Sequence, residues 1–160
     1  WFWLSKMIGI SMKDAKIYID KFFETYPLVR EFLDETIKFC EENKYVETYF
    51  WRKRFINGIN DSNKIIKSSA ERESINMPIQ WTSADIIKIE MIQSANFIKK
   101  KNLKSIMIMQ VHDELVFDVY PWEEEILKKE ISNIMENIMD KWEIKLKTDF
   151  WIWFNWREAK

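Results

Sequence analysis

Three ionisable residues, His112, Asp113 and Glu114, stand in a row inside the otherwise mostly apolar stretch 105–120. The run SIMIMQV before them places apolar side chains on both faces of an extended chain, which predicts a strand buried on both faces. The run after them alternates as a second strand does. A carboxylate beside a buried strand must be paired, protonated or bound to a cation. Metal binding by Asp113 is one interpretation of this pattern, and an ordinary polar hairpin turn is the alternative, which is the commoner explanation of such a run taken alone.

The run QVHDELVFDV, residues 110–119, resembles the last of the three polymerase motifs of family A DNA polymerases. The resemblance implies that Asp113 binds magnesium in the palm, that Glu114 is a supporting carboxylate and that His112 contacts the primer end. The family's other metal-binding aspartate lies in its first palm motif, for which this chain has no match. We therefore expect the chain to supply part of a two-magnesium site and to be inactive by itself.

A second set of polar side chains, Arg72, Asn76 and Gln80, follows the spacing i, i+4, i+8. On an unbroken helix each such step advances about 40°, so the three side chains share one face. Spacing alone also fits an ordinary polar helix face. The surrounding run AERESINMPIQWTSADIIKIEMI resembles the family's long palm helix, which implies that these residues contact the minor groove of primer–template DNA. The acceptors there recur in every base pair, which suits binding without sequence preference.

Residues 1–63 read as mainly helical. Ser11 and Asp14 form a capping-box-like start for a helix over residues 12–25, and Pro27 can open a second helix that reaches about Asn43. Extended runs at 45–50 and 52–56 predict a hairpin around Trp51, followed by a loop over 57–63.

Later residues predict long helices and further extended segments. Ser68 or Ser69 is expected to cap a helix that runs to about Lys100 and is interrupted near Pro78, which has no N–H. A helix over 123–141 and a final strand over 145–150 follow. The first residues, WFWLSKMIGISMKDAKIYIDKFFETYP, resemble the family's fingers, and FNWREAK resembles its C-terminal end.

The expected fold class is α+β. It comprises an antiparallel palm sheet with a buried β-hairpin packed against long helices, plus a mainly helical, partial fingers segment. Residues 1–64 are expected to belong to the fingers and residues 65–160 to the C-terminal part of the palm, as one fragment of a larger polymerase domain.

Composition excludes several classes of protein. Lys and Arg number 25 and Asp and Glu 26, so any DNA-binding surface must be local. The run Arg52, Lys53 and Arg54 is a candidate phosphate contact or a solvated strand end. The single Cys40 excludes an internal disulfide and is expected to be a buried structural thiol. The absence of a membrane-length apolar run, a signal peptide and an initiator Met favours a cytoplasmic protein and a piece of a longer chain.

The resemblance implies template-directed DNA synthesis, in which a primer 3′-hydroxyl attacks the α-phosphate of a deoxynucleoside triphosphate. Two metal ions stabilise the attacking and leaving oxygens in such displacements. The expected partners are primer–template DNA and deoxynucleoside triphosphates, in a monomeric enzyme of DNA replication and repair. Two alternatives stay open: a non-catalytic module that binds duplex DNA, and a metal-dependent phosphodiester hydrolase that uses Asp113, Glu114 and Asp118.

Tryptophan is abnormally frequent and glycine abnormally rare. The chain has nine Trp and two Gly, whereas ordinary usage predicts roughly eleven Gly. Most of the tryptophans stand where the family usually or often has glycine: Trp1, Trp3, Trp51, Trp81, Trp122, Trp151 and Trp153, whereas Trp156 matches a family tryptophan. Our hypothesis is that the source decodes UGA as glycine. A base-stacking aromatic cluster is the alternative, and it leaves the loss of glycine unexplained.

Overall fold

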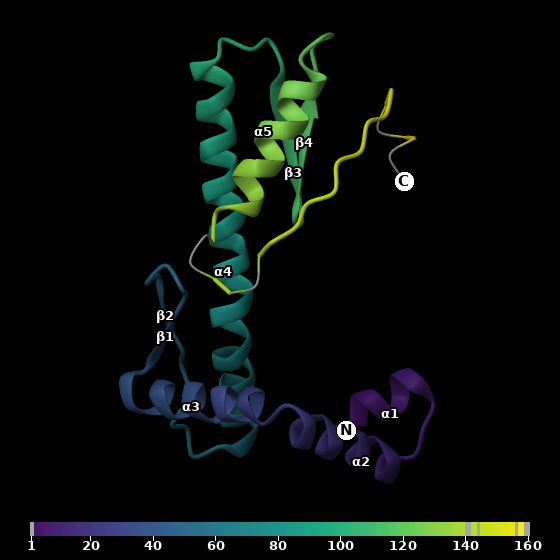
Figure 1. Ribbon diagram of the computed structural model, residues 1–160. Helices are drawn as coiled ribbons and strands as arrows, with labels where there is room; N and C mark the ends of the chain where they lie inside the picture. The colour runs from purple at the N-terminus through teal and green to yellow at the C-terminus, as the bar shows by residue number, and fades with distance from the viewer. Residues whose placement is uncertain (1, 140–141, 144, 156, 159–160) are drawn as a thin grey trace. The chain divides into compact units, whose positions relative to one another are not determined.

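The computed structural model describes residues 2–139, 142–143, 145–155 and 157–158. The chain forms two compact units, Trp1–Trp81 and Thr82–Lys160. The described residues contain helices and two separate two-stranded antiparallel sheets, joined by loops (Figure 1). This confirms the expected α+β class, while the division into fingers and palm at residue 64 stays a prediction. No helix in the described ranges combines the length and apolar character needed to cross a bilayer.

The first unit begins with three helices, α1 (Phe2–Ile8), α2 (Met12–Thr25) and α3 (Pro27–Asn43). The Ser11 hydroxyl accepts a hydrogen bond from the Asp14 N–H at 3.1 Å and donates one to the Asp14 carboxylate at 2.7 Å, so it caps α2 as predicted. Pro27 occupies the first turn of α3, where a missing N–H costs nothing. Both helix starts confirm the sequence prediction.

The hairpin of β1 (Tyr45–Glu47) and β2 (Lys53–Phe55) lies where the sequence predicts it, with shorter strands. Its inward residues join the loop after it, α3 and α4 in one apolar cluster. The cluster consists of Cys40, Val46, Ile56, Ile59, Ala70 and Met77, and Trp81 packs against it. Cys40 is fully buried, and burial raises the pKa of its thiol, which confirms the structural role expected for it.

Helix α4 (Lys64–Lys100) starts earlier than predicted and is not interrupted. Asn63 caps it, because its side-chain oxygen accepts the Ile65 N–H at 3.0 Å. The prediction that Ser68 or Ser69 caps this helix is therefore wrong: the loop supplies an acceptor more than one turn earlier. The interruption near Pro78 is also wrong. Proline removes one helical hydrogen bond there, and the flanking turns keep the helix continuous.

In the second unit β3 (Ile106–Val111) pairs antiparallel with β4 (Glu114–Asp118), and α5 (Glu124–Glu136) follows. Leu127 and Ile131 form the buried face of α5, and the helix is shorter than the expected range 123–141. The final strand expected over 145–150 is absent from the described residues of that segment. The Thr148 N–H instead donates to the Glu136 carboxylate at 3.0 Å, so a side chain takes the place of a strand partner.

The β3–β4 hairpin is not buried on both faces as the sequence predicts. Ile106 and Ile108 are each 56% exposed. Met109 is 39% exposed as well, so apolar side chains of β3 remain uncovered among the described residues. The alternation of residue types therefore predicts the strands correctly and their burial incorrectly.

Candidate metal site and nucleic-acid interface

The turn between β3 and β4 consists of His112 and Asp113, because Val111 pairs directly with Glu114. His112 has a φ of 54°, in the left-handed region that histidine adopts more readily than most residues. The Gln110 side-chain amide donates to the His112 carbonyl oxygen and so ties the turn to its own strand. The sequence therefore predicts the position of the turn correctly, and the side chains of His112, Asp113 and the adjoining Glu114 are all exposed.

The two adjacent carboxylates, Asp113 and Glu114, offer the oxygen ligands that magnesium prefers. Magnesium is commonly held by one or two carboxylates together with substrate phosphates, so an exposed pair suits that role. Within the described ranges, no three or more His, Cys, Asp or Glu side chains gather into a group able to hold a metal ion. The residues present therefore fit part of a magnesium site, and the expected loss of hydration beside a buried strand does not apply.

Asp118 lies away from this turn. It pairs with Ile106 at the open end of the hairpin, whereas Glu114 pairs with Val111 beside the turn. At about 3.4 Å per residue, Glu114 and Asp118 are roughly 14 Å apart along β4. The hydrolase alternative needs the carboxylates of Glu114 and Asp118 on one metal ion with Asp113. The register of the hairpin keeps Asp118 away from the other two.

The three predicted DNA contacts lie in the first unit, and the continuous helix α4 carries all of them. Arg72, Asn76 and Gln80 are exposed, while Ser74 and Met77 between them are buried against the core. This confirms the shared face that the spacing predicts, while its role in DNA binding stays a prediction. The Arg72 guanidinium donates to the Ser68 hydroxyl at 3.2 Å, which leaves most of its donors directed at solvent.

The arginines of the β1–β2 hairpin have partners that the sequence did not reveal. The guanidinium carbons of Arg52 and Arg54 lie 4.2 Å and 4.7 Å from the centre of the Trp81 ring. Arg54 also donates through Nε to the Glu73 carboxylate at 2.8 Å. A phosphate would have to compete with the carboxylate and the aromatic ring for these groups.

Lys53, between the two arginines, is also engaged. Its ammonium group donates to the Tyr45 hydroxyl at 3.1 Å and lies 3.3 Å from the Glu47 carboxylate. These hydrogen bonds raise the pKa of Lys53, and the bond to Tyr45 has the largest effect. The alternative, a solvated strand end, therefore describes the basic run of this hairpin better than an open phosphate site does, and the structure adds that its charges are paired within the protein.

Glu123 is a structural residue that sequence reasoning missed. Its carboxylate accepts the N–H of Lys104 at 2.9 Å, the N–H of Ser105 at 2.8 Å and the Ser105 hydroxyl at 2.6 Å. These bonds lower the pKa of Glu123, and the bond from the Lys104 N–H has the largest effect. They fasten the chain entering β3 to the start of α5. No local sequence signal marks this bond, since its partners are 18 and 19 residues away.

A second missed carboxylate is buried. Glu90 on α4 is 4% exposed, and burial raises its pKa to about 7. One turn later on the same face, the Ser94 hydroxyl is fully buried, and within the described residues it has no hydrogen-bonding partner. The burial of Glu90 could have been predicted from the sequence, because an acidic residue stands there within the apolar pattern of the helix.

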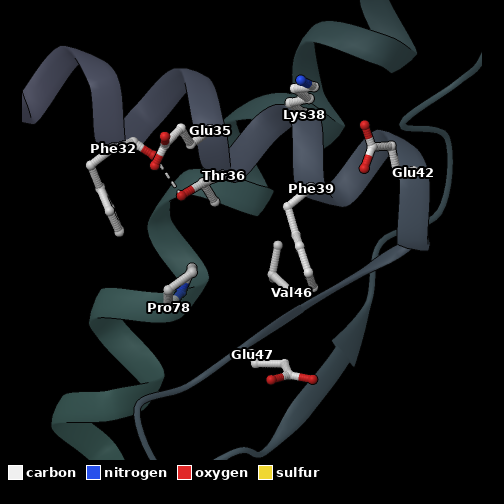
Figure 2. Close-up of a pocket in the computed structure, with 9 residues that line it drawn as sticks. All are labelled: Phe32, Glu35, Thr36, Lys38, Phe39, Glu42, Val46, Glu47 and Pro78. Carbon is white, nitrogen blue, oxygen red and sulfur yellow. Dashed lines mark hydrogen bonds between the residues drawn. The ribbon is translucent and has the colours of Figure 1, made fainter.

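The pocket in Figure 2 belongs to the first unit and is lined by α3, β1 and Pro78. Glu35, Glu42 and Glu47 line it beside a single cation, Lys38. Three carboxylates against one ammonium group repel phosphate, so this pocket is no candidate for DNA or nucleotide binding.

The comparisons with known proteins agree on one family. A family model described as DNA polymerase family A matches residues 1–158. The chain is 41% identical over 157 residues to DNA polymerase I of Caldicellulosiruptor bescii and 38% identical over 157 residues to that of Bacillus subtilis. Each alignment covers 98% of this chain and 18% of the relative. The chain therefore spans less than a fifth of the length of these relatives.

A solved structure shares the fold. The POL domain of Pol1 from M. smegmatis, in complex with DNA primer-template and dNTP, matches with a TM-score of 0.81 and 33% sequence identity. The match covers 84% of this chain and 24% of that chain. Since the family model extends over nearly every residue, the chain belongs to DNA polymerase family A.

Proposed function

We propose that this chain is part of a template-directed DNA polymerase that extends a primer from deoxynucleoside triphosphates, in DNA replication or repair. The observation that carries the proposal is the exposed Asp113–Glu114 pair at the turn of a hairpin whose sequence, QVHDELVFDV, resembles a family A polymerase motif. The similarity to a polymerase domain in complex with primer-template and dNTP supports the same reaction.

The turn is the proposed reaction site. Asp113 binds magnesium with Glu114 in support, and the adjacent His112 contacts the primer end. When bound in pairs, magnesium ions stabilise the attacking and leaving oxygens of an in-line displacement at phosphorus. The exposure of both carboxylates supports this role, because substrate phosphates need access to the same ion.

The exposed face of α4 is the proposed duplex-binding surface. Asn76 and Gln80 donate to minor-groove acceptors, and Arg72 donates to acceptors or to phosphate. The buried residues on the opposite face hold α4 against the core and so fix the direction of all three side chains. Because each base pair offers similar acceptors in the minor groove, this surface would hold any primer–template.

The chain supplies one part of the catalytic centre in this proposal. The turn offers two carboxylates, and no three-ligand metal group occurs among the residues that the structure describes. We therefore expect no primer extension by this chain alone, and the second aspartate to come from elsewhere in the complete gene product. Its partners are primer–template DNA and deoxynucleoside triphosphates.

The test is a primer-extension assay on the complete gene product, run beside a nuclease assay on the same labelled duplex. A polymerase lengthens the primer only when template, magnesium and all four triphosphates are present. Shortening of the DNA without triphosphates, lost on Asp113→Asn, would instead establish the hydrolase. Duplex binding with neither reaction would establish the non-catalytic binding module.

A further inference from the structure

Trp51 occupies a position in the β1–β2 hairpin that is built for glycine. The Thr48 N–H donates to the Arg52 carbonyl oxygen at 3.0 Å, and the Trp51 N–H donates to the Thr48 carbonyl oxygen at 3.0 Å. These bonds close a loop of three residues whose last member, Trp51, has a φ of 65°. Hairpins of this kind use a type I turn followed by a left-handed residue, and glycine is the residue suited to that place.

Trp122 occupies a second such position, in the turn that precedes α5. The Glu123 N–H donates to the Tyr120 carbonyl oxygen at 3.1 Å, which closes a four-residue turn. Pro121 is the second residue of this turn, and Trp122, the third, has a φ of 75°. Proline followed by a left-handed residue is the pattern of a type II turn, whose third position calls for glycine or asparagine.

Packing does not explain either tryptophan. Trp51 is 78% exposed and Trp122 is 97% exposed, so neither indole gains burial in return for the backbone strain. The left-handed conformation lowers the folded-to-unfolded ratio of an ordinary residue by about 5- to 30-fold, whereas glycine adopts it freely. Both glycines that the chain retains, Gly9 and Gly58, have positive φ values, 69° and 81°.

The other described residues with positive φ have ordinary explanations. Lys44 ends α3 in a left-handed cap, and Asn102 and His112 are residue types enriched in this region. A bulky residue in this region is an outlier. Two outliers of one residue type, in a chain with nine Trp and two Gly, point to one common cause.

We infer that the natural protein carries glycine at positions 51 and 122, and that the source decodes UGA as glycine at both. UGA differs by one base from the tryptophan codon UGG and from the glycine codon GGA. If the source reads UGA as glycine, a translation that assigns tryptophan to UGA places tryptophan at each of these glycine positions. The turn geometry supports glycine at both positions independently of any likeness to a family, and the codon is left to the coding DNA.

The direct test is the coding DNA together with the mass of tryptic peptides from the native source. The peptides are residues 45–52 and residues 105–128, which contain positions 51 and 122. We expect UGA at both codons and glycine in both peptides. UGG codons, or tryptophan in either peptide, would overturn the inference. Neither readout involves polymerase activity, so this test and that of the proposed function fail separately.

The strain argument has its own test in matched variants of the chain. Trp51→Gly and Trp51→Ala both remove the indole, but only glycine relieves the left-handed backbone. The glycine variant should have a folded-to-unfolded ratio at least about fivefold above that of the alanine variant, and the same should hold at position 122.

Trp3 provides the control for these variants, because it is 81% exposed within α1, where the backbone is helical. There the order should reverse, with alanine more stable than glycine. Equal stability of the glycine and alanine variants at positions 51 and 122 would overturn the assignment of strain to these turns.

Discussion

Glu90 should make the chain less stable as the pH rises through neutrality. Its side chain is 4% exposed, and burial raises its pKa from an ordinary 4.5 to about 7. That rise corresponds to about 3 kcal/mol of preference for the protonated form in the folded state. Burial is the cause of this shift, so ionising the carboxyl group costs free energy in the folded chain.

The sign follows from the proton balance. Below about pH 4.5 the carboxyl group is protonated in both states and adds no penalty. Between about 4.5 and 7 the unfolded chain releases the proton while the folded chain keeps it, so the free energy of unfolding falls. Above about pH 7 the penalty stays at about 3 kcal/mol.

Glu90→Gln removes the ionisation and keeps the shape of the side chain. We expect urea unfolding to show a gain of about 3 kcal/mol for this variant at pH 8 and of no more than about 1 kcal/mol at pH 5. Glu143→Gln, at an exposed carboxylate, is the matched control and should change little at either pH. An equal effect of Glu90→Gln at both pH values would refute the burial argument.

Three further predictions concern the proposed duplex-binding face, the anchor of β3 and Trp81, on which the hairpin arginines stack. Gln80→Ala and Arg72→Ala should each weaken primer–template binding by about 1 kcal/mol on every template, as measured by titration of several duplexes. Gln93→Ala, on another face of α4, is the control and should not weaken binding. A loss confined to one template would contradict the minor-groove role. Glu123→Gln should lower the Tm at neutral pH. The difference in Tm from the unchanged chain should vanish as the pH falls through the lowered pKa of Glu123, because the stabilising hydrogen bonds require the ionised form. A difference in Tm that is independent of pH would contradict this. Trp81→Gly removes the ring on which two guanidinium groups stack. If these groups then contact phosphates, duplex affinity should rise and depend more steeply on salt. An unchanged salt dependence would show that both groups stay bound within the protein.

The sequence predicts local features of the fold well and long-range features poorly. The capping of α2 by Ser11 and the start of α3 at Pro27 depend on a few neighbouring residues, and both predictions are confirmed. The cap of α4 was placed too late because Ser68 and Asn63 are both suitable caps, and only the path of the preceding loop decides between them. Burial of the β3–β4 hairpin depends on what covers it, which residue alternation does not specify.

The candidate site divides in the same way. Helical periodicity suffices to place Arg72, Asn76 and Gln80 on one exposed face, and the motif places Asp113 in a turn. The carboxylate of Glu123 binds backbone groups 18 and 19 residues away, and no periodicity encodes such a contact. The sequence leaves the arginines of the hairpin open to either a phosphate contact or a solvated strand end, because their internal partners come from a helix distant in sequence.

The central claim is that Asp113 holds a catalytic magnesium ion and makes no essential contact with the duplex. The most direct measurement compares Asp113→Asn with Asp149→Asn, a matched exposed control, in the complete gene product. We predict that Asp113→Asn lowers the rate of primer extension with magnesium by about a thousandfold or more, a loss of several kcal/mol of charge stabilisation, while the Kd for primer–template changes by less than about threefold. Near-normal extension by Asp113→Asn, or a loss explained by weaker duplex binding, would contradict the account.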